Sequence, residues 1–88
     1  MRKIKMFWDF RGQDSLKTAE HQCIHLKEFF IKEGIEYHQI ETDKQSAVFV
    51  SAFAVVNEKD VEVLRTTLRP NRGQLAEQLT TSIPHSSL

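Results

Sequence analysis

The chain has 88 residues, which is the length of one small domain. Its 12 basic and 12 acidic side chains cancel, which argues against nucleic acid as a partner, because nucleic-acid binders normally carry a basic excess. Cys23 is the only cysteine, so an intrachain disulfide is excluded, and no apolar run is long enough to cross a membrane. We therefore expect a cytoplasmic protein with no membrane contact.

Residues 2–10 predict a β-strand, because apolar and polar side chains alternate along them. The side chains expected to face the core are Ile4, Met6, Trp8 and Phe10. Lys3 and Lys5 fall on the opposite face, where lysine discourages pairing with stray strands.

Residues 15–33 predict a helix that is bounded at both ends. Asp14 or Ser15 is expected to cap its first turn, and Gly34 is a typical residue to follow its last turn. The stripe expected to face the core consists of Leu16, Ala19, Cys23, Leu26 and Phe30, widened by Ile24 and Ile31.

Glu20 and Lys27 interrupt the edge of this apolar stripe. One interpretation is that their aliphatic stems cover the rim of the core while the charges reach water. The other is that they make polar contacts across a subunit boundary.

Two strands are expected next, at residues 35–42 and 47–56, with polar residues between them. The second is apolar on both faces, which is typical of a central strand that is covered twice. A buried helix would show the same run, but the β-branched and aromatic content favours a strand.

Residues 58–69 predict a second helix, which Asn57 caps and Pro70 ends. A short third helix is expected from the positions Leu75, Ala76, Leu79 and Ile83. Residues 1–81 would then form one α+β domain, and residues 82–88 a frayed tail.

The order β-α-β-β-α predicts a ferredoxin-like (split βαβ) sheet of strand order 1-3-2, with both helices on one face. The other face would carry an apolar patch made of Phe7, Tyr37, Phe49, Phe53 and Val55. Such a patch usually marks an interface. We expect a homodimer that stacks two sheets there, with the third helix as the alternative cover.

A candidate ligand site lies where the first strand ends, near the loop after the second strand. Its residues are Trp8, Asp9, Arg11, Gln13, Asp43 and Lys44. Arginine beside an aromatic wall suits a small anionic ligand or a carboxylate on a protein partner. The alternative interpretation is a surface pair between Asp9 and Arg11 next to a core tryptophan.

Metal and nucleophile chemistry have little support in the sequence. His21 and His25 have the spacing of two metal ligands on a helix, but they lie opposite its apolar stripe and lack a third ligand. Cys23 falls on the buried stripe, where a thiol is usually unreactive. We predict no metal and no cofactor.

These patterns favour a small homodimeric binding or regulatory module without catalysis. The competing hypothesis is a small enzyme of the dimeric α+β barrel type, with a pocket between sheet and helices. That pocket would be lined by Trp8, Tyr37 or His38.

Overall fold

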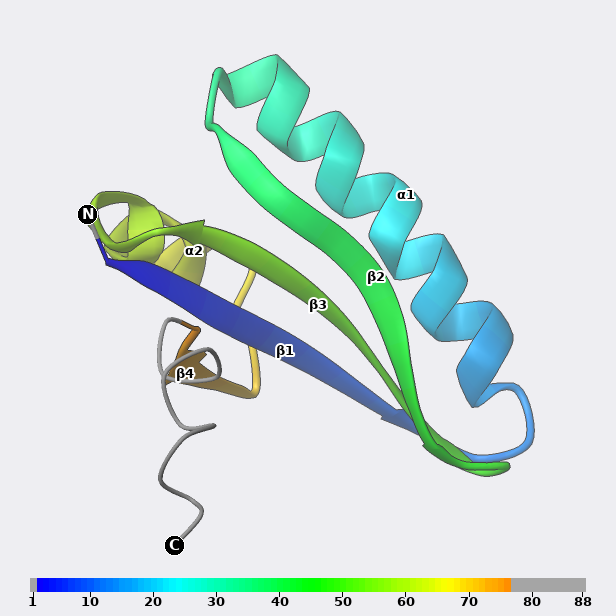
Figure 1. The fold of residues 1–88 in the computed structure, drawn as a ribbon. Coiled ribbons are helices and arrows are strands. Elements are labelled where there is room, and N and C mark those ends of the chain that lie inside the picture. The colour runs from blue at the N-terminus through cyan, green and yellow to red at the C-terminus, as the bar shows by residue number, and fades with distance from the viewer. Residues whose placement is uncertain (1, 77–88) are drawn as a thin grey trace, which may run out of the picture.

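The computed structural model describes residues 2–76, which form one sheet with helices packed on it (Figure 1). In chain order the elements are β1 (Lys3–Arg11), α1 (Ser15–Glu33), β2 (Tyr37–Ser46), β3 (Phe49–Asn57), the 3₁₀ turn η1 (Glu58–Asp60), α2 (Val61–Thr67) and β4 (Arg72–Leu75). None of the helices in this part of the chain has the length and apolar character needed to cross a membrane.

The sheet has the strand order β2-β3-β1-β4, and every neighbouring pair is antiparallel. The α+β class is therefore confirmed, and the predicted order 1-3-2 is contained in the four-strand order. β1 and β3 are the two central strands, paired from Lys3 opposite Asn57 to Arg11 opposite Phe49. This register fixes which side chains share a face.

The prediction of a third helix is wrong where the structure describes it. Leu75 belongs to β4 and pairs with Ile4 of β1, and the backbone N–H of Ala76 donates to the carbonyl of Lys3 over 2.8 Å. The physical reason is the free edge of β1, whose backbone groups need partners that a helix could not provide. Residues 77–88, including the predicted positions Leu79 and Ile83 and the predicted tail, lie outside the described residues.

The strand β2 is longer than predicted and continues through the polar segment up to Ser46. Polar side chains are tolerated there because β2 is an edge strand and its backbone pairs with β3. β3 in turn begins at Phe49, so Val48, which was expected to belong to the strand, lies in the hairpin turn and is half-exposed.

The helix α1 has the predicted bounds but not the predicted N-terminal cap. Gly34 adopts φ 69°, and the next amide, that of Ile35, donates to the carbonyl of Phe30 over 2.9 Å. Asp14 makes no side-chain cap bond. Ser15 does not cap either, because its hydroxyl is buried and has no hydrogen-bond partner within residues 2–76.

The second helix is shorter than predicted. A 3₁₀ turn covers residues 58–60, and only Val61–Thr67 are α-helical. Asn57 does not cap it, because its side-chain amide donates to Glu36 over 3.1 Å and its carbonyl oxygen bonds the ring of His38 at 2.8 Å. Asn57 thus connects β3 to the start of β2.

The main core lies between the helices and one face of the sheet, as predicted for helices on a single side. Its buried members are Met6, Trp8, Ala19, Cys23, Leu26, Phe30, Ile40, Val50, Ala52, Ala54, Val56 and Leu64. Small residues on β3 let the helices approach closely. The indole of Trp8 crosses this layer and donates to the carbonyl of Leu68 at 2.8 Å, which ties β1 to the end of α2.

Replacing Gly34 by Ala should lower the free energy of unfolding by about 1 kcal/mol, because a Cβ disfavours the positive φ at this position. Urea unfolding followed by circular dichroism measures the change. Gly73→Ala is the matched control, since its Cβ would meet only ordinary contacts at 3.7 Å. Equal losses for the two variants would contradict the role assigned to Gly34.

Candidate functional site

The face of the sheet opposite α1 and α2, called the second face below, has its own small apolar cluster. Phe7 of β1 lies opposite Phe53 of β3, with ring centroids 6.0 Å apart, and Val55 lies next to them. Ala76, just after β4, packs against this cluster. All three cluster residues are buried within a single chain, at 3%, 5% and 7% exposure.

Cationic side chains lie over these rings. The Lys5 ammonium is 4.1 Å from the ring centroid of Phe53, and the guanidinium carbon of Arg72 is 3.9 Å from that of Phe7. Arg11 lies in the same way over Phe49, at 4.2 Å. The quadrupole of an aromatic ring attracts a cation above its face, so each ring holds a charge in place.

Four of the five residues predicted to form a dimer interface share this face. They are Phe7, Phe49, Phe53 and Val55. Tyr37 is the exception, because its ring packs against Phe30 of α1 at 5.5 Å and belongs to the main core. The side-chain alternation shifts at the start of β2, where the register with β3 is irregular between Tyr37 and Gln39.

A polar network stands beside the aromatic cluster, centred on the carboxylate of Asp9. The buried hydroxyl of Ser51 donates to it over 2.6 Å, and Arg72 donates two bonds of 3.2 and 3.3 Å from Nε and Nη2. The backbone N–H of Asp9 donates to the side-chain carbonyl of Asn71 at 2.7 Å. The fork of Arg72 thus fixes the carboxylate in one orientation.

The charge state of Asp9 follows from these contacts. Burial by itself raises the pKa of the carboxyl, but hydrogen bonds from Ser51 and Arg72 and the positive charges of Arg72 and Arg11 outweigh it. The pKa of Asp9 is therefore below its ordinary value of 3.8. The network holds an ionised carboxylate whose charge Arg72 already neutralises.

The six residues of the predicted ligand site are divided between the two faces. Asp9, Arg11 and Asp43 lie on the second face, and Asp43 is opposite Ser51. Trp8 lies on the other face and is a core residue. Lys44 pairs with Val50 of the main core, and Gln13 is exposed in the turn before α1.

Sequence reasoning missed Asn71 and Arg72, the two residues that complete the Asp9 network. Asn71 directly precedes β4 and Arg72 is its first residue, and this strand was not predicted. Both residues lie more than sixty positions from Asp9 in the sequence. The available signal was Pro70 followed by Asn71 and Gly73, a turn from which the chain can enter a strand.

The residues considered for metal or nucleophile chemistry lie on α1. The rings of His21 and His25 stack at 4.5 Å, and Nδ1 of His25 is 3.6 Å from the Glu28 carboxylate. Within residues 2–76 no group of three or more His, Cys, Asp or Glu side chains could hold a metal ion. Burial raises the pKa of the Cys23 thiol, which disfavours the reactive thiolate.

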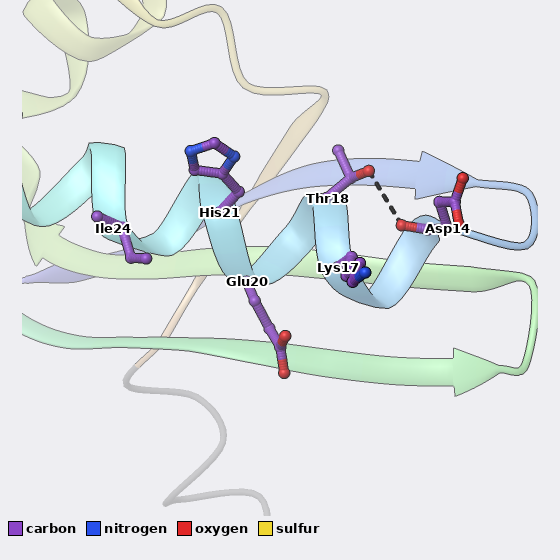
Figure 2. A pocket seen from close by; sticks show the side chains of 6 residues that line it. All are labelled: Asp14, Lys17, Thr18, Glu20, His21 and Ile24. Carbon is purple, nitrogen blue, oxygen red and sulfur yellow. Dashed lines mark hydrogen bonds between the residues drawn. The ribbon is translucent and has the colours of Figure 1, made fainter.

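A hollow on the outer surface of α1 is lined by side chains of one helical segment (Figure 2). Its lining residues are Asp14, Lys17, Thr18, Glu20, His21 and Ile24. The Thr18 hydroxyl is already used, because it donates to the carbonyl of Asp14 at 3.0 Å. Because one segment supplies all these side chains, the hollow does not bring together groups from different elements.

Asp9→Asn should lower the free energy of unfolding by about 1 to 2 kcal/mol at pH 7, because two charge-assisted bonds with Arg72 are lost. The folded-state pKa is depressed, so the charge contributes fully above pH 3.8 and its contribution is lost as the pH falls through the folded-state value. The difference in the free energy of unfolding between wild type and variant should therefore become smaller below about pH 4.

Urea unfolding at several pH values checks this expectation. Asp14→Asn is the control, because the Asp14 side chain makes no cap bond. If the difference in the free energy of unfolding between wild type and Asp9→Asn stays constant down to pH 2, the charge state assigned to Asp9 is refuted.

Comparison of the chain with models of known protein families, with curated proteins and with solved structures finds no match.

Proposed function

We propose that the protein is a small non-catalytic α+β binding module, which acts as a homodimer and binds an anionic group through the second face of its sheet. The observation that carries the proposal is the row of cations held over the rings of β1 and β3. The anionic group would be a carboxylate or phosphate on a small ligand or on a protein partner.

Two of these cations are available for a ligand. Lys5 and Arg11 form no ion pair within residues 2–76, whereas Arg72 is paired with Asp9. Each is positioned by an aromatic ring, so less side-chain freedom is lost when an anion binds. Free charges in fixed positions are the property that a binding site for an anion requires.

Charge is divided unequally across the second face. Lys5 and Arg11 lie on β1, while the carboxylates of Glu41 and Asp43 lie on β2 at the far edge. An anion is therefore favoured over β1 and β4 and disfavoured over β2. This asymmetry would orient an extended acidic ligand along β1.

The side chains packed between the sheet and the helices support binding rather than catalysis. The competing enzyme hypothesis needs a pocket there with Trp8, Tyr37 or His38 in its wall. Trp8 and Tyr37 are instead packed in or against the main core, and the ring of His38 bonds Asn57.

We also propose that the fold is of the ferredoxin-like kind. With β4 beside β1, the element order β-α-β-β-α-β is that of a split βαβ, or ferredoxin-like, unit. Proteins of that architecture have many unrelated functions, so it adds no function of its own.

NMR titration of the ¹⁵N-labelled chain with hexaglutamate and with inorganic phosphate tests the proposed site. We expect the amides around Lys5, Arg11 and Phe49 to shift, and the double reversal Lys5→Glu with Arg11→Glu to weaken binding at least roughly tenfold. Lys59→Glu, an exposed reversal on η1, is the matched control.

The proposal fails if neither probe shifts these amides at millimolar concentration. It also fails if the control weakens binding as much as the double reversal does.

A further inference from the structure

The helix α1 carries large apolar side chains that the main core does not use. Leu16 is 38% exposed, Ile24 is 55% exposed and Ile31 is 74% exposed. The predictions that Leu16 lies on the core stripe and that Ile24 and Ile31 widen it are therefore wrong. The core contacts of α1 are made by Ala19, Cys23, Leu26 and Phe30. Ile24 and Ile31 lie on the flank of the helix instead.

Two charged residues of opposite sign alternate with these apolar ones. Glu20 lies between Leu16 and Ile24, and Lys27 lies between Ile24 and Ile31, in steps of three or four residues. The five residues form a continuous row on one side of α1, which we call the flank stripe. Its order is apolar, acidic, apolar, basic, apolar.

The flank stripe lies on the side of α1 next to the edge strand β2. The helix α1 packs against β2 as well as β3, and Figure 1 shows it running alongside β2. In Figure 2 the side chain of Glu20 extends toward the β2 side, whereas His21 points to the opposite side. Because β2 is an edge strand, no further strand of residues 2–76 lies beyond it.

We propose that the flank stripe is the contact between two copies of this chain, with their α1 helices packed antiparallel about a two-fold axis at Ile24. The proposal rests on the homodimer of the proposed function and assigns its surface. In this arrangement Leu16 faces Ile31 of the second copy, and Glu20 faces Lys27 of the second copy.

The sequence of charges identifies a second copy as the occupant. A two-fold axis reverses the order of the row, so the acidic position of one copy meets the basic position of the other, twice in each dimer. A parallel arrangement would instead oppose Glu20 to Glu20 and Lys27 to Lys27. The stripe is thus complementary to itself in the antiparallel orientation alone.

The apolar side chains of the flank stripe are more exposed than the Phe7, Phe53 and Val55 cluster of the predicted sheet interface. Phe7, Phe53 and Val55 on the second face are at most 7% exposed in a single chain, so stacking two sheets would bury little more of them. Ile24 and Ile31 still have most of their surface in water, and pairing of two helices at about 8–10 Å would remove it.

Sedimentation equilibrium of the full chain at micromolar to millimolar concentration tests the inference. We expect a reversible dimer, and Ile24→Glu should weaken it at least roughly thirty-fold because two like charges meet at the axis. Circular dichroism should be unchanged, since Ile24 is exposed. Val63→Glu, at an exposed position on α2, is the matched control and should leave the dimer intact.

A charge exchange gives a second, more specific test. Glu20→Lys and Lys27→Glu should each weaken the dimer, and the double variant should restore it, because every acidic position again faces a basic one. A structural role within one chain predicts no such rescue.

Three outcomes would overturn the inference. A wild type that stays monomeric at millimolar concentration removes both this interface and the homodimer of the proposed function. A dimer that tolerates Ile24→Glu, or one that Phe49→Lys dissociates while the flank variants do not, removes the interface alone. Anion binding in the NMR titration is a separate readout from all three.

Discussion

The constraint on which this fold depends is that its central strands must be covered on both faces by a short chain. Every residue from Val50 to Asn57 in β3 is buried, yet both helices lie on the same side of the sheet. On the helix side, the small residues of β3 allow α1 to pack close to the strand, and the helix covers this face. On the second face, Phe7 and Phe53 pack together under the cationic side chains of Lys5 and Arg72.

Covering aromatic rings with cations links the stability of the second face to the anion recognition that we propose for it. A lysine or arginine stem removes apolar surface from water, while its charged end stays at the surface and remains able to bind. The Asp9 network adds a fixed negative charge beside this layer, and Arg72 takes part in both features. The side chains that complete the fold are therefore the ones that give the second face its charge pattern.

The sequence predicted the parts of the fold that depend on local periodicity. The bounds of α1, the alternation of β1 and the central position of β3 each follow from apolar spacing and from the glycine after Glu33. The strand β4 could not be read in this way, because four residues with one glycine carry no periodic signal. It exists because the free edge of β1 supplies backbone partners, and that edge is a property of the assembled sheet.

The same limit applied to the candidate site. Asp9 and Arg11 were identified from their place at the end of a strand, and both lie on the second face. The sequence pattern also predicts Trp8 there as an aromatic wall for the ligand, although successive side chains of a strand point to opposite faces and Trp8 lies in the main core. Asn71 and Arg72 were missed because only tertiary structure brings them to Asp9.

The position of β1 in the sheet also has a consequence for biosynthesis. β1 is synthesised before both of its hydrogen-bonded neighbours, β3 and β4, and β4 ends at Leu75. Both edges of a strand rich in large apolar side chains therefore stay unpaired until β3 and then β4 have been made. The lysines at positions 3 and 5 would keep that nascent segment from associating with others until its partners arrive.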